Sequence, residues 1–579
     1  MPVPSMGLLR SLRSVMYPQQ CLRASLSTSC RRAVQKEFSR TPEQEADFRT
    51  SFRAQMYESM ADRVKRERDE ARRTYTEEPL TAFGFLLSFG TVTLATAIIA
   101  FTMGWSGPFE LNPNSTLPLE QVDPLDRILS RKPHAMEAAW IDLCLILGHE
   151  YVDEMEDTRR SHAQSDWSSY DTPKDEIPGI VCYPATTQQV SEIMTMLHKR
   201  HIPVTAYSGG TSLEGHFAAT RKGVCIDFSR MDQVLKLHKE DLDVVVQPAV
   251  GWQDLNEELE KDGLFFPPDP GPGAMIGGMV GTGCSGTNAY RYGTMKEWVV
   301  SLTVVLADGK VIKTRQRPRK SSAGYDLTRV FIGSEGTLGL ITEATLKVIP
   351  RPKSESVAAV SFKSVRDAAQ CVFKVVGEGV QIAAVELLDD KQMQCINDAG
   401  ATERVWKETP YLFFKFGGTP GAVKEQIDIV KRIAKAQGSQ SFDFARNKDE
   451  AAELWSARKE ALWSVMAKRR DESDHVWTTD VAVPISRLPD IIEQTKDDIS
   501  SSGLLATIVG HVGDGNFHAI ILFNDKERKT AEDVVHRMVE RAIEMEGTAT
   551  GEHGVGMVKR DALVDELGQT TVDAMRKVR

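Results

Sequence analysis

IVCYPATTQQVSEIMTMLHKRHIPVTAYSGGTSLEG, residues 180–215, is the stretch of the chain that decides the fold class. It predicts a strand, a helix, a second strand over Ile202–Ala206 and then a glycine-rich loop. The helix begins with a capping box, because Gln189 follows Thr186 by three residues, and its apolar residues keep helical spacing. These residues are Val190, Ile193, Met194 and Leu197. The loop over residues 208–212 offers backbone N–H groups and hydroxyls to an anion, so a diphosphate would fit there.

Two more glycine-rich stretches follow. DPGPGAMIGGMVGTGCSGTNAYRYGTM, residues 269–295, contains a formal G-x-G-x-x-G, but no hydrophobic strand precedes it and no apolar-periodic helix follows, so the dinucleotide fingerprint is a chance match. We expect an extended ribbon there, almost free of side chains, that approaches a flat ring or a phosphate closely. FIGSEGTLGLITEATLKV, residues 331–348, places Glu335 before a strand that ends near Val348. Each stretch alone is compatible with a tight turn, but three in order indicate a ligand site.

Composition excludes several classes of protein. The chain has 579 residues, 26% charged and 41% hydrophobic, which is typical of a globular protein with several domains and excludes a small binding module. The net charge of −10 is spread without a basic stripe, so we expect no nucleic-acid partner. The eight cysteines form no Cys-x-x-Cys pair, which argues against a zinc ribbon, a Cys-ligated iron–sulfur centre, a disulfide scaffold or an attached c-type haem.

The N-terminus has the composition of a mitochondrial presequence. Residues 1–36 contain no Asp or Glu but several arginines and serines. On a helical wheel, apolar residues gather on one side while Arg10 and Arg13 lie off it, as an amphipathic import helix requires. The apolar residues are Leu8, Leu9, Leu12, Val15 and Met16. A disordered basic tail is the alternative. Residues 37–78 are expected to form a charged arm in the matrix.

One apolar segment is long enough to span a membrane. No charged residue occurs over residues 79–109, and a single transmembrane helix over 79–105 is expected, with a buried core helix as the alternative. No basic residue occurs over residues 105–126, whereas six precede the segment, so the N-terminal side should stay in the matrix. The six are Arg63, Lys65, Arg66, Arg68, Arg72 and Arg73. We therefore expect an inner-membrane protein whose later part faces the intermembrane space, beginning with a linker and N-terminal helices over 106–175.

The most chemically informative motifs are HVGDGNFHAIILF, residues 511–523, and GEHGVG, residues 551–556. Three of their side chains could hold a divalent cation, and a fourth could accept a proton, which suits removal of a proton and a hydride from an alcohol. The four are His511, His518, Glu552 and His553. Gly513 and Gly515 indicate a loop that enters a strand over Phe517–Phe523. Two histidines and a carboxylate suit zinc, manganese or iron(II), and a lone histidine in such a chain is more often an ordinary core residue.

These motifs together resemble a known superfamily. The succession Pro184-Ala185-Thr186, Ser208-Gly209-Gly210-Thr211, Gly277-Gly278 and Gly333-Ser334-Glu335-Gly336-Thr337 is similar to the FAD-binding domain of the vanillyl-alcohol oxidase and p-cresol methylhydroxylase superfamily. The C-terminal motifs resemble its D-2-hydroxy acid dehydrogenase branch, and essentially the whole chain resembles the fungal mitochondrial D-lactate dehydrogenase (cytochrome) family. The resemblance implies an α+β fold with a two-subdomain, PCMH-type FAD-binding domain over 176–352. It also implies an antiparallel-sheet cap or substrate domain over 353–505 and a C-terminal metal and catalytic segment over 506–579.

The resemblance also implies roles for individual residues. It implies non-covalent FAD, with His216 a polar contact rather than a covalent attachment point. It places the metal, zinc or manganese, on His511, His518 and Glu552, and makes His553 the catalytic base. The residues expected to bind the flavin are Ser208, Gly209, Gly210, Thr211, Ser212, Gly277, Gly278, Gly281, Ser285, Glu335, Ile341 and Asn516.

Arg458 matches the arginine that binds the substrate carboxylate in this family. It lies in LWSARKEALW, residues 454–463, where we expect a single helix. A forked guanidinium suits a carboxylate. The alternative is a surface salt bridge with Glu453 or Glu460, which are near in sequence.

The reaction implied is oxidation of a D-2-hydroxy acid, with hydride transfer to flavin and electrons passed on to cytochrome c. Ile520 and Leu462 stand where relatives that act on D-2-hydroxyglutarate have asparagine and threonine. Because a buried unpaired charge is costly, this favours D-lactate, which becomes pyruvate. A D-2-hydroxyglutarate or glycolate dehydrogenase remains an alternative, as does a non-catalytic, membrane-anchored assembly protein. Family members continue past the helix over Thr571–Val578 with a short tail, which is expected but does not follow Arg579 here.

Overall fold

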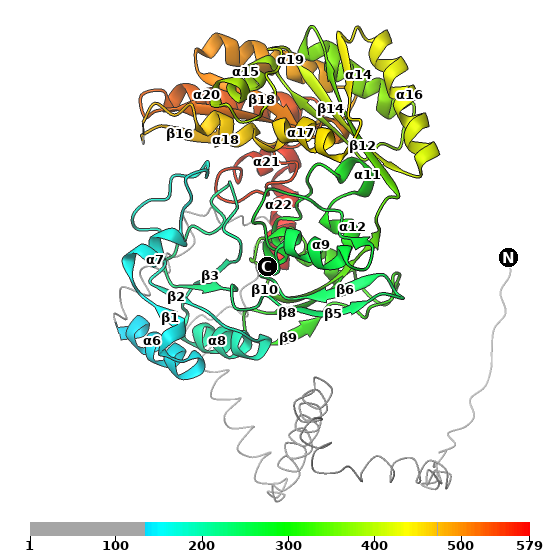
Figure 1. Cartoon of the computed structure of the whole chain (residues 1–579). Coiled ribbons are helices and arrows are strands. Elements are labelled where there is room, and N and C mark those ends of the chain that lie inside the picture. Colours follow the sequence, from blue (N-terminus) through cyan, green and yellow to red (C-terminus); the bar gives the residue numbers. More distant parts are fainter. Residues whose placement is uncertain (1–133, 472) are drawn as a thin grey trace, which may run out of the picture. The chain divides into compact units, whose positions relative to one another are not determined.

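The computed structural model describes residues 134–471 and 473–579 (Figure 1). The expected presequence, matrix arm and transmembrane helix, residues 1–105, lie outside the described residues. Within the described ranges, no helix is both long enough and apolar enough to cross a membrane.

The first sheet has four strands in the order β1-β2-β4-β3, and β2 and β3 both run parallel to β4. α8 (Thr187–Arg200) connects β2 to β3, and Thr186 Oγ1 accepts a hydrogen bond from Gln189 N at 3.1 Å, as predicted. The four apolar residues predicted for its inner face are buried there, against α6 (His134–Leu147) and the sheet. The strands are β1 (Val152–Asp153), β2 (Ile180–Cys182), β3 (Val204–Tyr207) and β4 (Val224–Asp227), and α7 (Glu156–Ser161) lies between β1 and β2 in sequence.

The second sheet has five antiparallel strands in the order β5-β6-β10-β8-β9. Helices α9 (Trp252–Glu260) and α10 (Ile276–Thr282) share its hydrophobic core. The strands are β5 (Val234–His238), β6 (Asp243–Val246), β8 (Val299–Val305), β9 (Val311–Lys313) and β10 (Leu340–Lys347). Smaller elements beside it are β7 (Leu264–Phe265), paired with β11 (Ile349–Pro350), and the short helices α11 (Ala289–Tyr292), α12 (Met295–Trp298) and α13 (Leu327–Phe331).

The extended ribbon expected over residues 269–295 is wrong. α10, α11 and the start of α12 occupy much of this stretch. Ile276, Met279 and Val280 are spaced three and four residues apart and are buried in the core of the second sheet. This short helical pattern stabilises α10 despite its glycines.

The third sheet is antiparallel and has eight strands, in the order β15-β12-β14-β13-β18-β19-β16 with β17 also paired to β19. One face packs against α14, α16, α19 and α20, and the other against α15, α17 and α18 (Figure 1). The strands are β12 (Ser354–Ser361), β13 (Ala384–Leu388), β14 (Tyr411–Gly418), β15 (Ser441–Phe444), β16 (His475–Thr478), β17 (Val481–Ala482), β18 (Leu505–Gly510) and β19 (Asn516–Phe523). The sequence division at residue 505 assigns β19 and nearly all of β18 to the C-terminal segment, yet both strands belong to this sheet.

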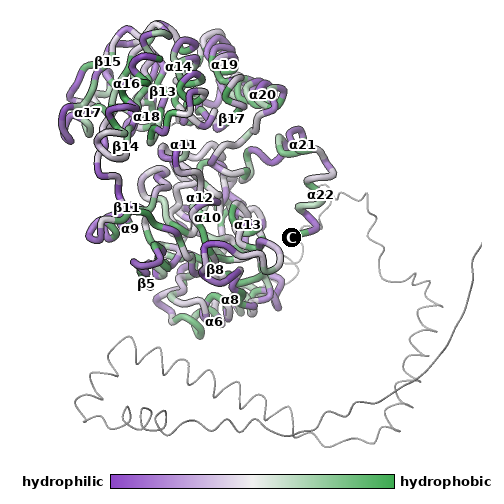
Figure 2. The backbone as a smooth tube through the Cα atoms, turned by 90° about the vertical axis from the view of Figure 1, so that its right-hand side faces the viewer, coloured by the Kyte–Doolittle hydropathy of each residue, from purple (hydrophilic) through white to green (hydrophobic). Residues whose placement is uncertain are grey.

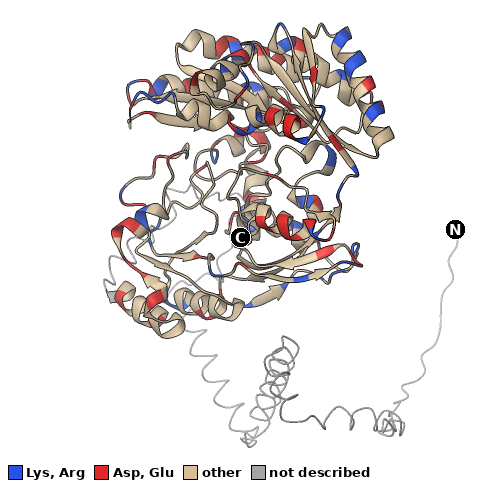
Figure 3. Ribbon diagram, in the orientation of Figure 1, with Lys and Arg blue, Asp and Glu red and all other residues tan. Residues whose placement is uncertain are grey.

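The helices around the third sheet are amphipathic. Hydrophobic and hydrophilic residues alternate along α14 and α16 in Figure 2, and acidic and basic side chains intermingle on the outer helices in Figure 3. The helices are α14 (Val365–Gly377), α15 (Asp390–Ala399), α16 (Pro420–Ala436), α17 (Lys448–Lys459), α18 (Ala461–Met466), α19 (Leu488–Ser502) and α20 (Arg528–Glu544). After α20 the chain leaves the sheet in a loop and ends with α21 (Ala562–Leu567) and α22 (Gln569–Val578).

Candidate active site

A cavity of about 2020 Å³ is lined by residues of all three sheets and of the C-terminal segment. Typical small-ligand pockets measure roughly 300–1,000 Å³, so this cavity has room for a large cofactor together with a substrate. Most of the residues predicted for the site line it, including the 208–212 loop, Arg458 and His553. Two residues predicted to bind flavin, Ser285 and Asn516, are not among the lining residues.

Ser285 and Asn516 contact the carboxylates of the site instead. Ser285 Oγ donates to Glu552 Oε2 at 2.7 Å, and Asn516 Nδ2 donates to Asp480 Oδ1 at 2.8 Å. Both side chains therefore hold carboxylates in place from outside the cavity.

The glycines of α10 give the cavity an open floor. A Cβ built on Gly278 or Gly281 would meet no atom within 4 Å, so these backbone positions face free space beside the cavity. At Gly277, by contrast, a Cβ would lie 2.6 Å from Pro248 Cβ. The 208–212 loop packs equally closely, since a Cβ on Gly209 would lie 2.7 Å from the carbonyl oxygen of Gly273. A flat ring system or a diphosphate can therefore approach the backbone here, and the residues present fit a flavin dinucleotide.

His511, His518 and Glu552 converge as the sequence predicts. Each offers a ligand atom within 4.8 Å of the other two. Glu552 Oε1 lies 3.0 Å from His511 Nε2 and 3.6 Å from His518 Nε2. Ligand atoms roughly 2.1 Å from a tetrahedral ion lie roughly 3.4 Å from one another, and the two distances bracket that separation. The donor set therefore fits a divalent metal.

The other nitrogen of each histidine faces an acceptor. His511 Nδ1 lies 2.9 Å from Glu386 Oε1, and His518 Nδ1 lies 2.8 Å from the carbonyl oxygen of Thr479. A proton on Nδ1 satisfies each acceptor and leaves Nε2 as the nitrogen for a metal, which is how outer partners usually orient metal-binding histidines.

Electrostatics differ between the two histidines. Burial, with the nearby charge of His553, lowers the pKa of His518 to about 3, so its ring is neutral. Burial also disfavours a charge on His511, but the carboxylates of Glu386 and Glu552 raise its pKa well above the ordinary value. Binding of a metal by His511 must therefore release a proton from Nε2.

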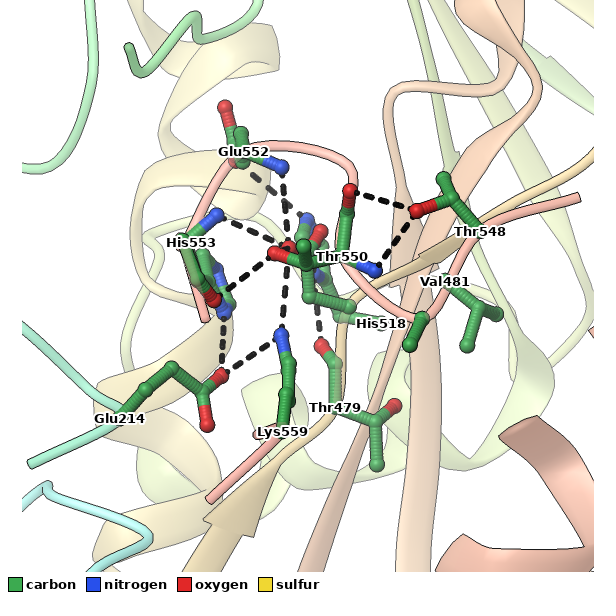
Figure 4. A network of polar contacts seen from close by, with 12 residues as sticks. Glu214, Thr479, Val481, His518, Thr548, Thr550, Glu552, His553 and Lys559 are labelled. Carbon is green, nitrogen blue, oxygen red and sulfur yellow. Dashed lines mark hydrogen bonds and ion pairs between the residues drawn. The ribbon is translucent and has the colours of Figure 1, made fainter. Parts of the chain in front are cut away.

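Asp480, His518 and His553 form a second group whose ligand atoms lie within 4.8 Å of one another. Asp480 Oδ2 already accepts the backbone N–H groups of Glu552 at 2.9 Å and His553 at 2.8 Å (Figure 4). It also lies 3.3 Å from the ammonium group of Lys559. An oxygen with these partners is poorly suited to a metal, so Asp480 acts as the anchor of the 551–556 loop.

His553 is placed by two neighbours. Its ring stacks on that of His518, with centroids 4.9 Å apart and an interplanar angle of 8°. Its Nδ1 lies 3.3 Å from Glu214 Oε1, which also lies 2.8 Å from Lys559 Nζ (Figure 4). Burial opposes ionisation of Glu214, but Lys559 and His553 lower its pKa, so it is a carboxylate. If Nδ1 donates to this carboxylate, Nε2 is free to accept a proton.

Arg458 lies near the C-terminal end of α17, and the single helix expected over residues 454–463 is wrong. The helix breaks at Glu460, where α17 ends and α18 begins at Ala461. Arg458 lines the cavity, and its Nε donates to Glu386 Oε2 at 2.7 Å rather than to an acid of its own helix. Leu462 and Ile520 line the same cavity.

Glu335, expected to contact the flavin, holds the 551–556 loop. Its two carboxylate oxygens accept the backbone N–H groups of Val555 at 2.7 Å and Gly556 at 2.9 Å, and His216 Nε2 lies 3.1 Å away. Gly554 has a positive φ of 84°, and a Cβ there would lie 2.8 Å from both Glu335 Oε1 and His216 Nε2. The loop thus needs glycine at this position.

Four buried charged residues of the site were not singled out from the sequence: Glu214, Glu386, Asp480 and Lys559. Glu386 and Asp480 interrupt apolar stretches, AAVELL and TTDVAV, and an acid in such a stretch is a usable signal because a buried charge needs a partner. Lys559, in an ordinary polar context, carries no such signal.

Comparisons with known proteins agree with this geometry. The family described as FAD binding domain matches residues 178–315, and the family described as FAD linked oxidases, C-terminal domain, matches residues 351–579. A mitochondrial D-lactate dehydrogenase [cytochrome] of Kluyveromyces lactis is 51% identical over 72% of this chain and 74% of its own length. D-lactate dehydrogenase [cytochrome] 1 of Saccharomyces cerevisiae is 47% identical over 80% of this chain and 81% of its own length.

Solved structures share the fold. 4-Ethylphenol oxidase from Gulosibacter chungangensis superposes with a TM-score of 0.64 at 17% identity, over 77% of this chain and 94% of that one. p-Cresol methylhydroxylase superposes with a TM-score of 0.62 at 16% identity, with the same coverage. The expected α+β, PCMH-type architecture is thereby confirmed.

Proposed function

Because the chain belongs to the mitochondrial D-lactate dehydrogenase (cytochrome) family, we propose that its cavity oxidises D-lactate with FAD as the hydride acceptor. The protein is a flavin-dependent oxidoreductase that converts D-lactate to pyruvate. The observation that carries this assignment is the convergence of His511, His518, Glu552, His553 and Arg458 on the cavity that the glycines of α10 leave open.

Each side chain has a definite task in the proposed reaction. Arg458 pairs with the substrate carboxylate, and His553 Nε2 accepts the hydroxyl proton. His511, His518 and Glu552 hold a divalent metal, zinc or manganese. When bound, the metal lowers the pKa of the hydroxyl, and the flavin accepts the hydride from C2. The substrate loses one proton and one hydride, which leaves pyruvate.

Non-covalent binding of FAD is supported by the surroundings of His216. Its ring lies against Glu335, which in turn holds Val555 and Gly556, so it has a structural task in the loop. Precipitation with acid tests this: the yellow colour should stay in solution, and colour retained in the pellet would contradict it.

The choice of D-lactate over D-2-hydroxyglutarate follows from the wall of the cavity near Arg458. Ile520 is only 2% exposed, and Leu462 packs against the same hydrophobic core. Neither side chain offers a polar partner to a second carboxylate.

A non-catalytic assembly role is disfavoured by the site itself. Such a protein has no need for a complete metal set beside a base, yet His511, His518, Glu552 and His553 are all assembled here.

The cellular arrangement is also a proposal. The named relatives are mitochondrial. The charge-free segment over 79–105 anchors the chain in the inner membrane, and the catalytic part faces the intermembrane space, where cytochrome c accepts the electrons. Protease treatment of mitochondria and mitoplasts tests this topology. The catalytic part should become digestible once the outer membrane is broken, and continued protection would contradict the proposal.

The function itself is tested by anaerobic flavin bleaching. D-Lactate should bleach the flavin of the purified protein, whereas L-lactate should not. Absence of bleaching by D-lactate, or equal bleaching by both enantiomers, would overturn the assignment.

A further inference from the structure

Glu386 is a fully buried carboxylate at the centre of a core strand. It lies in β13, where Val385 and Leu387 pack into one hydrophobic core and Ala384 and Leu388 into the core on the opposite face. Its exposed fraction is 0%. A charge in such surroundings is costly unless it is fully paired, so its partners explain its presence.

Both oxygens of Glu386 contact residues of the active site. Oε2 accepts a hydrogen bond from Arg458 Nε at 2.7 Å, and Oε1 lies 2.9 Å from His511 Nδ1. The three side chains come from three elements: β13, α17 and the turn after β18. One carboxylate thus joins the residue that pairs with the substrate to a residue that holds the metal.

Each contact sets the orientation of its partner. The bond from Nε uses one of the five N–H groups of Arg458 and leaves the four on its terminal nitrogens for a second carboxylate. Acceptance from His511 Nδ1 leaves Nε2 directed to Glu552, at 3.0 Å. The unoccupied edges of both partners therefore belong to the substrate and metal positions.

We propose that Glu386 is a positioning residue that fixes the spacing between Arg458 and His511, and through it couples metal affinity to capture of the substrate carboxylate. The inference rests on the function proposed above and deepens it. It differs from a purely structural role, in which Glu386 only neutralises a buried arginine.

The test is Glu386→Gln in the flavin-loaded full chain. Glutamine keeps the size of the side chain, but its amide group presents N–H donors to an N–H on either Arg458 or His511. We expect the dissociation constants for Zn²⁺ and Mn²⁺, measured against a competing chelator, to rise roughly 10- to 100-fold. The KM for D-lactate should rise roughly tenfold, the loss expected when one charge-assisted hydrogen bond is removed.

Asp389→Asn is the matched control. Asp389 follows β13 directly, is also 0% exposed, and pairs with Lys496 Nζ at 2.5 Å rather than with either partner of Glu386. Its replacement should lower the melting temperature and leave metal affinity and KM at the wild-type values. If Glu386→Gln does not fold, Glu386→Asp takes its place. Aspartate keeps the charge but is one methylene too short to reach both partners, so it should weaken metal binding and raise KM.

The outcomes separate the two levels of the argument. If the wild type binds metal and is bleached by D-lactate, while the Glu386 variants keep wild-type metal affinity and KM, the positioning role is overturned and the proposed function stands. If the wild type neither binds metal nor is bleached, the proposed function fails and the positioning role fails with it.

Discussion

The imidazole rings of His518 and His553 lie face to face, 4.9 Å between centroids and 8° from parallel. One ring belongs to β19 of the third sheet, and the other to the loop after α20. The stacking holds the proposed base directly beside a proposed metal ligand. The two consecutive residues Glu552 and His553 thereby serve different functions: the first binds the metal and the second accepts the proton.

Replacing the base should slow the chemical step without affecting the cofactor. In His553→Gln, the rate of flavin reduction by D-lactate should fall roughly 10²- to 10⁴-fold, the usual contribution of a general base. Stopped-flow absorbance measures this rate. The control is His536→Gln, which changes a histidine with an exposed side chain on α20. Reduction at the wild-type rate in His553→Gln would exclude this residue as the base.

Lys559 is the cation that balances two buried acids. Its ammonium group lies 2.8 Å from Glu214 Oε1 and 3.3 Å from Asp480 Oδ2, and both acids are fully buried. Lys559→Met leaves them without this partner, which should destabilise the fold by about 3–5 kcal/mol. Denaturant unfolding measures the change. Lys529→Met, at an exposed pair with Asp533, should cost less than about 1 kcal/mol. Equal stabilities of the two variants would contradict the network.

The two neighbouring glycines of α10 should respond differently to alanine. Gly278→Ala places a methyl group in open space beside the cavity, so the protein should fold normally and bind FAD more weakly. Gly277→Ala forces a contact with Pro248 and should lower the melting temperature. Flavin titration of the apoprotein and thermal unfolding separate the two effects. Unchanged FAD affinity in Gly278→Ala would move the flavin away from this helix.

Specificity should change with two residues of the cavity wall. Ile520→Asn combined with Leu462→Thr supplies polar groups to a second carboxylate, so kcat/KM for D-2-hydroxyglutarate should rise relative to that for D-lactate. Steady-state kinetics with both substrates measure the ratio. If the wild type already oxidises D-2-hydroxyglutarate as well as D-lactate, the apolar wall does not determine specificity.

Much of this site is readable from local sequence. The capped helix α8, the strand β19 and the glycine loops follow from periodicity and turn chemistry within short stretches. Glu552 and His553 are adjacent in sequence, and His511 and His518 lie in one motif, so their motifs indicated a shared site. Local patterns also misled, because α10 forms from only a few apolar residues and the helix around Arg458 breaks at Glu460.

The contacts between distant segments were not predictable in this way. Glu386 meets His511 across 125 positions of sequence, and Glu214 meets His553 across 339. Such pairs depend on which strands become neighbours in the third sheet and on how the C-terminal loop packs against the first half of the chain. Local propensity does not contain that information.

The central claim is that a metal held by His511, His518 and Glu552 acts beside the flavin. The most direct test is the rate of anaerobic flavin reduction by D-lactate before and after chelation, with Zn²⁺ or Mn²⁺ then added back. The account predicts fast reduction, a large loss of rate in the metal-free protein with its flavin still bound, and recovery on addition of metal. Reduction at an undiminished rate in protein shown to be free of metal would contradict it.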